Sequence, residues 1–279
     1  MILLGRYNKL SVLRKTPHGI YFGDSRGNDV LLPKKFVTDD MEEGAFFDLF
    51  IYTDGEDRLV ATTQKPYIEY KKCACLTVVE VNKFGAFLDW GLDKHLLLPY
   101  GEQTGKLEAG QKIVVLMYID IQTNRLAATQ RIDRFIMNND ISLVEGQKVN
   151  IMNWRETPLG YNVIIENQYI GLLYHSQSYK KFIEGEEGMG IVLKIRDDKK
   201  IDITLNSFEI KNPLDASNLI MNMLQNSDYG FLPYNDNSSA EDIVNTFNMS
   251  KKMFKKSIGG LFKRRLIVIS EDGIRLTGD

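Results

Sequence analysis

The amino-acid sequence predicts a mainly β chain of three tandem five-stranded barrels, followed by a smaller α+β module at the C-terminus. Two observations predict it: one residue pattern recurs three times before residue 212, and helical periodicity replaces it afterwards. The first two copies are 66 residues apart, too far for a helical solenoid unit and about right for a very small domain. We therefore expect four domains, at residues 1–66, 67–140, 141–211 and 212–279.

The repeat is anchored on three glycines, Gly19, Gly85 and Gly160. An apolar pair follows each anchor after twelve and thirteen residues, and the next position holds Pro33, Pro99 or Tyr174. Each copy begins with β-branched and aromatic residues around the glycine, which in a strand marks a bulge or a sharp bend. Charged turns and further apolar stretches follow, so each copy reads as five strands in roughly 65 residues.

Five strands in so short a unit, with a bent first half, fit a closed Greek-key barrel of the oligonucleotide-binding type. Closure is expected because it removes the exposed edges that a flat sheet would leave.

Composition limits the function without naming it. The chain has 279 residues, 43% of them hydrophobic and 26% charged, which is ordinary for soluble globular domains. Its 35 basic and 37 acidic residues give a net charge of −2, so nucleic-acid binding would have to depend on local features.

No run of eighteen apolar residues occurs, and the N-terminal segment is too short for a signal peptide, so we expect a cytoplasmic protein without membrane contact. Cys73 and Cys75 are expected to be packing residues of one strand.

The second copy, with VVEVNKFGAFLDW, LLLPY and GQKIVVLMYIDIQTNRLAAT, resembles the RNA-binding repeat of ribosomal protein S1. The resemblance implies a nucleic-acid face made of two aromatics flanking the glycine, the residue after the apolar pair, and an acidic-basic pair around the last turn. In copy two these are Phe84, Phe87, Pro99, Asp120 and Arg125. In copy one they are His18, Tyr21, Pro33, Asp54 and Arg58.

Two departures from that family distinguish the copies. A proline stands in copies one and two where the family usually has histidine, and copy three has Leu159 and Asn162 in place of the aromatics. Copy three offers instead Tyr161, Tyr174, His175, Lys199 and Lys200. Aromatic residues of strands are also common in cores, so exposure of Phe84 and Phe87 separates a stacking platform from a packing role.

The C-terminal quarter predicts three helices and a hairpin. The first helix follows Pro213 and ends near Asn226; the second has Ser238 as its N-cap with Glu241 three residues later; the third starts after Ser250. In the third helix the apolar face is Phe254, Ile258, Leu261 and Phe262, and the opposite face carries Lys252, Lys256 and Lys263. Residues 243–270 contain seven lysines and arginines and no acidic residue.

A hairpin around Glu271 and Gly273 completes the order of a winged helix, whose third helix reads nucleic acid in many members. Alternatively, the lysines only solvate one face and the module docks on a protein.

With GFLPYNDNSSAEDIVNTFNMSKKMFKKSIGGLFKRRLI in its C-terminal part, the chain resembles the bacterial conserved virulence factor B family. The resemblance implies a cytoplasmic RNA-binding protein that influences gene expression, with no catalytic residues.

An enzyme is not indicated. The histidines at 18, 95 and 175 are scattered, and the sequence has neither a GxxxxGK[ST] phosphate loop nor a GxGxxG motif, so we expect no metal and no cofactor. The interpretation is a post-transcriptional or translational regulator that binds single-stranded RNA and works with the ribosome or the transcription machinery. The alternatives are a protein-interaction scaffold and a DNA-binding transcription regulator.

Overall fold

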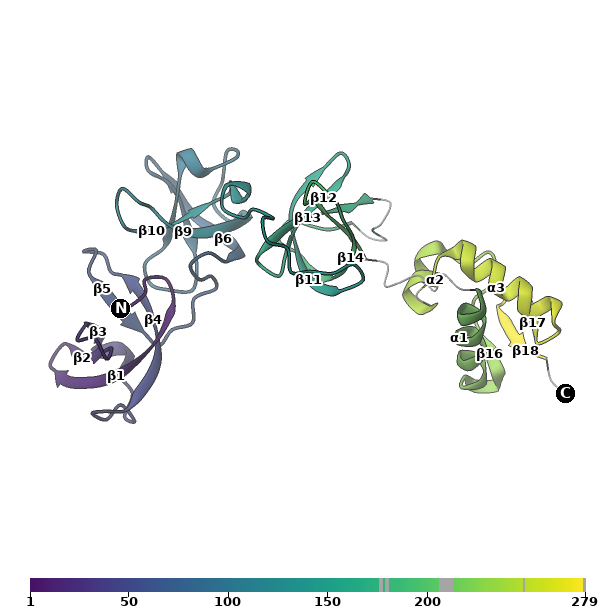
Figure 1. The fold of residues 1–279 in the computed structure, drawn as a ribbon, viewed down its shortest axis with the longest axis horizontal. Coiled ribbons are helices and arrows are strands. Elements are labelled where there is room, and N and C mark those ends of the chain that lie inside the picture. The colour runs from purple at the N-terminus through teal and green to yellow at the C-terminus, as the bar shows by residue number, and fades with distance from the viewer. Residues whose placement is uncertain (176–177, 179–180, 206–212, 248, 278–279) are drawn as a thin grey trace. The chain divides into compact units, whose positions relative to one another are not determined.

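A computed structural model of the chain describes residues 1–175, 178, 181–205, 213–247 and 249–277. Three β-barrels follow one another along the sequence, and a helical module comes last (Figure 1). The predicted fold class is therefore confirmed. Residues 1–137 make up most of one compact unit, and residues 138–279 make up most of a second. Each proposed domain range contains one sheet, while the expected boundary at residues 211 and 212 lies outside the described residues, as does Asn248.

The first barrel is closed in the order β1-β2-β3-β5-β4. Its parallel β3–β5 pairing, with Leu31 opposite Val60, joins the two ends of the sheet. The core inside it includes Phe22, Leu32 and Leu49. Its elements are β1 (Tyr7–Thr16), β2 (Gly19–Gly23), β3 (Asp29–Pro33), the 3-10 turn η1 (Lys34–Phe36), β4 (Phe46–Thr53) and β5 (Leu59–Thr62).

The second barrel has the order β10-β9-β6-β7-β8 and is nearly closed, because β8 and β10 lie beside each other. Its elements are β6 (Cys73–Asn82), β7 (Gly85–Asp89), β8 (Leu96–Pro99), η2 (Tyr100–Glu102), β9 (Lys112–Ile119), β10 (Leu126–Thr129) and, after it, η3 (Ile132–Arg134).

The third barrel is closed like the first, in the order β11-β12-β13-β15-β14. Its elements are β11 (Lys148–Thr157), β12 (Gly160–Ile165), β13 (Tyr169–Tyr174), β14 (Glu187–Ile195) and β15 (Ile201–Thr204).

The anchor glycines begin the second strand of each barrel and have left-handed backbone angles, with φ of +144°, +149° and +157° at Gly19, Gly85 and Gly160. A Cβ at any of the three would lie within 2.2 Å of a carbonyl oxygen on the neighbouring strand. Only glycine fits so close an approach of two backbones. The bulge predicted at the glycine lies instead in the preceding strand, between Val12 and Arg14, between Val78 and Glu80, and between Asn153 and Arg155.

The first two barrels share an apolar seam. Phe50 and Tyr52 of β4 make edge-to-face contacts with Trp90, which follows β7, at ring-centroid distances of 5.9 and 6.2 Å. All three rings are buried in one hydrophobic cluster that also holds the core of the second barrel. Because aromatic side chains bury large apolar areas, this seam joins the two barrels into one packed body.

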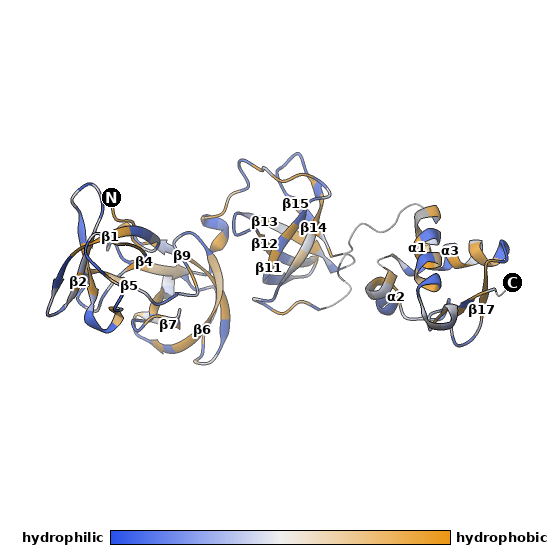
Figure 2. Cartoon of the chain, turned by 90° about the horizontal axis from the view of Figure 1, so that it is seen from below, coloured by the Kyte–Doolittle hydropathy of each residue, from blue (hydrophilic) through white to orange (hydrophobic). Residues whose placement is uncertain are grey.

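The C-terminal module packs three helices against a small sheet of order β16-β18-β17. In Figure 2 hydrophobic and hydrophilic residues alternate around α1 and α3, as expected of helices with one buried face. Its elements are α1 (Pro213–Gln225), η5 (Asp228–Gly230), β16 (Phe231–Leu232), α2 (Ala240–Phe247), α3 (Lys251–Lys263), β17 (Ile267–Ile269) and β18 (Ile274–Leu276).

Two details of the predicted helices were wrong. Ser239, not Ser238, caps α2: its hydroxyl accepts from the Asp242 amide at 3.0 Å, while Ser238 accepts from the Asn235 amide in the preceding turn. Phe262 is 52% exposed and lies off the buried face of α3. The predicted cap of α3 is confirmed, because the Ser250 hydroxyl accepts from the Met253 amide at 3.1 Å.

Candidate nucleic-acid interface

The two aromatics predicted in copy two both reach the surface. Phe84 lies in the turn before β7 and is 61% exposed; its amide donates to the Asn82 side chain at 3.0 Å, which fixes the turn. Phe87 of β7 is half-buried beside Leu97 of β8, its cross-strand partner. Neither ring is a core residue, so the packing alternative loses its main support. Phe84 also has a cation beside it, since the Lys83 ammonium lies 5.1 Å from its ring centroid.

These rings border a hollow of about 320 Å³ on the second barrel. All five residues carried over to copy two line it: Phe84, Phe87, Pro99, Asp120 and Arg125. They come together because Gly85 pairs with Pro99 across β7 and β8, while Asp120 and Arg125 flank the β9–β10 turn. Strands 2 and 3 and the loops after strands 1 and 4 are the oligonucleotide-binding surface of this barrel type.

The acidic and basic members of that set have different roles. The Asp120 carboxylate accepts from the Gln122 amide at 2.7 Å and so stabilises its own turn. Arg125 points toward the first barrel, where its guanidinium donates to the Asp57 carboxylate. Asp120 therefore stabilises the turn of the site, and Arg125 supplies one of its cations.

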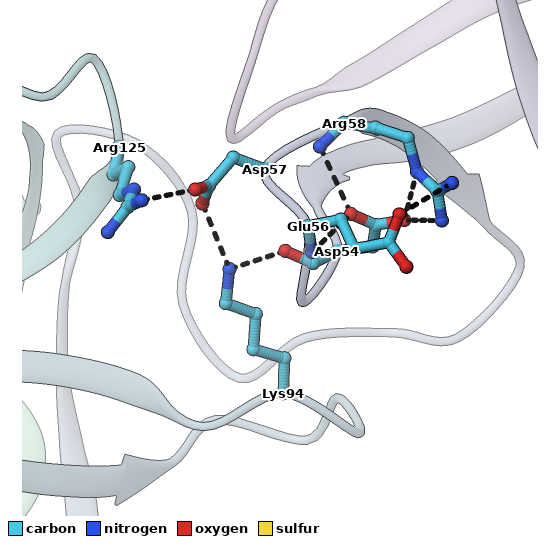
Figure 3. A network of polar contacts seen from close by, with 6 residues as sticks. All are labelled: Asp54, Glu56, Asp57, Arg58, Lys94 and Arg125. Atoms are coloured by element: carbon cyan, nitrogen blue, oxygen red, sulfur yellow. Dashed lines mark hydrogen bonds and ion pairs between the residues drawn. The ribbon is translucent and has the colours of Figure 1, made fainter.

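A polar network joins the two barrels beside the hollow (Figure 3). Asp57 lies between Arg125 and Lys94, whose ammonium is 3.7 Å from the carboxylate. Lys94 also donates to the Asp54 backbone oxygen at 2.6 Å. Elsewhere between the barrels Lys35 donates to Asp93, and this bond, against some desolvation, holds the pKa of Asp93 below its ordinary value.

In the first barrel three of the predicted residues, Tyr21, Asp54 and Arg58, have partners within the chain. The Arg14 guanidinium lies 4.1 Å from the centre of the Tyr21 ring, and Arg58 donates to Asp54 at 2.7 and 2.9 Å. Although desolvation alone would raise the pKa of Asp54, the bonds from Arg58 and from turn amides keep it below its ordinary value. His18 is exposed beside Gly19.

The third barrel differs again. Tyr161, one of the residues offered for its face, is buried, with its ring packed edge-on against His175 at 5.0 Å, so that expectation was wrong. His175 is exposed, and its Nε2 lies 3.1 Å from the Thr157 oxygen. The Tyr174 hydroxyl accepts from Arg196, which also donates to Asp202 at 2.9 Å. Lys199 donates to the Asn139 oxygen at 2.8 Å, and Lys200 pairs with Asp198.

Helix α3 presents its cations as predicted. Lys252, Lys256 and Lys263 are exposed, whereas Phe254, Ile258 and Leu261 are buried in the core of the module. Three further exposed cations belong to the same surface but were not proposed individually: Lys255, Arg264 and Arg265. The sequence count of seven basic residues already contained them.

Sequence reasoning missed the residues that complete the hollow of barrel two. They are Lys94 and His95, in the loop before β8, and Tyr52 and Thr53 from the first barrel. The Trp90 indole holds that loop in place by donating to the Lys94 oxygen. No local signal could have found Tyr52 and Thr53, because they reach the site only through the docking of two barrels.

Comparisons with known families agree with this organisation. The S1 domain matches residues 4–64 and 72–131, and the CvfB-like winged helix domain matches residues 218–276. The chain is thus a multidomain protein of S1 and winged-helix modules, a class of domains that indicates nucleic-acid binding.

It is also 26% identical over 261 residues to conserved virulence factor B of Staphylococcus aureus, in strains bovine RF122 / ET3-1 and USA300. The alignment covers 90% of this chain and 86% of the relative. The resemblance to the conserved virulence factor B family is confirmed.

Among solved structures, the chain is similar to a multidomain protein with nucleic acid binding domains from Streptococcus pneumoniae TIGR4. The identity is 22%, 98% of each chain is covered and the TM-score is 0.43.

Two further findings concern the part of the chain that the structure describes. No helix there has the length and apolar character needed to cross a membrane. No group of three or more His, Cys, Asp or Glu side chains there is arranged to hold a metal ion.

Proposed function

We propose that this chain is a non-enzymatic, cytoplasmic protein that binds single-stranded RNA and regulates gene expression after transcription. The observation that carries the proposal is the hollow of the second barrel, where an exposed Phe84 and a half-exposed Phe87 lie with Pro99, Asp120 and Arg125. The proposal includes binding to the ribosome or to the transcription machinery as a partner.

Stacking supplies most of the affinity in this mechanism. An exposed ring can stack on any base, which contributes roughly 1 to 3 kcal/mol per base and needs no large net charge. That suits a chain whose 37 acidic residues outnumber its 35 basic ones. The half-buried Phe87 is held by β7 and β8, so it would offer a fixed platform at little cost in side-chain entropy.

The exposed cations of α3 supply the electrostatic part. Lys252, Lys256 and Lys263 would contact phosphates and not base edges. They would therefore strengthen binding to all sequences about equally. Because they belong to a separate domain, their contacts would add to those of the barrel by raising the effective concentration of the second binding event.

The test is a binding titration of the whole chain against single-stranded RNA, single-stranded DNA and duplex RNA of one sequence at fixed salt. We expect single-stranded RNA to bind most tightly and duplex RNA least, because stacked and paired bases cannot reach the rings. Preference for duplex DNA in an added arm would favour a transcription regulator. No binding to any nucleic acid would favour the protein-interaction scaffold.

A further inference from the structure

The two cations beside the hollow of barrel two, Arg125 and Lys94, face one carboxylate of the neighbouring barrel. Asp57 receives the Arg125 guanidinium on one oxygen and lies 3.7 Å from the Lys94 ammonium on the other (Figure 3). Both cations line the same hollow as Phe84 and Phe87. An anionic group from barrel one is therefore placed at the cationic side of the proposed RNA site.

The turn that carries Asp57 holds it there. Asp54 braces the turn, because its Oδ1 accepts from the amides of Glu56 and Arg58 at 2.9 and 3.0 Å. Asp57 itself has a left-handed backbone with φ of +62°, a conformation that asparagine and aspartate tolerate better than most residues. Glu56, one residue earlier, pairs with Arg58 at 2.8 Å instead. The turn thus directs one of its two neighbouring carboxylates toward barrel two and keeps the other on barrel one.

We propose that Arg125 and Lys94 form a phosphate subsite of the RNA-binding hollow, and that Asp57 occupies this subsite until a strand displaces it. The inference rests on the proposed function. A carboxylate and a phosphodiester offer similar charged oxygens, and a guanidinium beside an ammonium binds either. Exposed ion pairs are weak and screened by salt, so a phosphate that arrives with a stacked base can replace Asp57.

In this proposal the two barrels remain packed together when Asp57 loses its ion pairs with Arg125 and Lys94. Phe50 and Tyr52 pack against Trp90 in the buried seam, and none of these three rings takes part in the ion pairs of Asp57. Binding therefore exchanges one anion for another at a preformed site. Asp57 would make the subsite selective for a nucleotide over a free anion. A free anion only replaces the ion pairs of Asp57, whereas a nucleotide phosphate also brings a base that stacks on the rings.

The experiment compares Asp57→Asn with Glu56→Gln in the full chain. Each removes one negative charge from the same turn, but only the first removes the partner of Arg125 and Lys94, and asparagine keeps the left-handed backbone. The probe is a short single-stranded RNA of mixed sequence, titrated at several salt concentrations. We expect Asp57→Asn to bind about two- to tenfold more tightly than the wild type, the range for losing one or two exposed ion pairs. Glu56→Gln should change affinity less.

The gain should vanish when the cations are absent. In a chain with Arg125→Gln and Lys94→Gln, adding Asp57→Asn should no longer raise affinity. Equal or weaker binding by Asp57→Asn than by Glu56→Gln would overturn the inference and make Asp57 a residue that positions Arg125. If the wild type binds no RNA, or Phe84→Ala binds as well as the wild type, the proposed function itself fails.

Discussion

Phe84 shows how a single residue separates packing from function. Its neighbours fix the backbone, since Asn82 accepts from the Phe84 amide and Gly85 approaches the Leu98 carbonyl, yet the ring stays 61% exposed. Leaving a phenylalanine in water forgoes roughly 1.5 to 3 kcal/mol of burial free energy. A stacking role would account for that cost.

We predict that replacing Phe84 and Phe87 together with alanine weakens single-stranded RNA binding by roughly 1 to 3 kcal/mol per stacked base. The matched control is Phe46→Ala, which removes a ring of similar exposure (64%) from barrel one, outside the hollow, and should leave affinity unchanged. Binding is measured by titration and folding by thermal melting. Loss of the cooperative unfolding transition in the double variant would mark the rings as core.

Cys73 predicts a pH dependence of stability. Burial in β6 raises the pKa of its thiol to about 12, against a small opposing effect of Lys72. The folded state therefore favours the neutral thiol, and its contribution to stability is complete below the unfolded pKa near 9 and falls as pH rises toward 12.

We expect this residue to reduce the free energy of unfolding by up to about 1.4 kcal/mol per pH unit above pH 9. Urea unfolding of the wild type and of Cys73→Ala between about pH 8 and pH 11 would measure it. The variant should be less stable at pH 8 but lose stability less steeply. Parallel slopes for the two proteins would contradict the prediction.

At the scale of elements, α3 combines a buried face with an exposed basic one. Phe254, Ile258 and Leu261 fix it in the module, and Ser250 caps its first turn. Lysines in that first turn oppose the helix dipole, which is mildly unfavourable, and a phosphate ligand would compensate for this.

We predict that changing Lys252, Lys256 and Lys263 to glutamine lowers the magnitude of the log-log salt slope of RNA binding by about two, because each phosphate contact contributes roughly 0.7. Stability should hardly change, since all three side chains are exposed. A control triple variant at exposed lysines of the first two barrels, Lys15, Lys106 and Lys112, should keep the wild-type slope. If the α3 variant keeps that slope as well, the winged helix is a protein-docking module.

At the scale of the whole molecule, the first two barrels behave as one packed body because their aromatic seam belongs to a single buried cluster. The chain has two tryptophans, Trp90 in that seam and Trp154 in the third barrel, so each compact unit carries one fluorescent reporter.

We predict that Phe50→Ala destabilises the first unit by about 3 to 5 kcal/mol, the cost of removing a buried ring from a packed core. With Trp154→Phe present, urea unfolding followed at Trp90 should shift to lower denaturant. With Trp90→Phe in its place, the transition followed at Trp154 should not move. A shift of both transitions would show that the two units unfold together. The milder variant Phe50→Leu should shift the transition at Trp90 in the same direction by a smaller amount.

Much of this protein follows from its sequence. A glycine is needed where the second strand of each barrel closely approaches a carbonyl of the third strand. The recurring glycines therefore indicate where the second strand of each copy begins. Helical periodicity and the Ser250 cap likewise define α3, because both depend on residues only a few positions apart. Phe84, Phe87, Asp120 and Arg125 were placed on one face through the resemblance of copy two to the S1 repeat.

Tertiary structure decided the rest. Whether Phe87 and Tyr161 reach the surface depends on what packs against each strand, and their residue types do not reveal it. The docking of barrel one on barrel two brings Tyr52 and Thr53 to the hollow and sets Asp57 against Arg125, across 68 residues of sequence. A local sequence pattern indicates only whether a segment is a helix or a strand and on which face of that element a residue lies. Contacts between domains depend on the shapes of two finished surfaces, which exist only after each domain has folded.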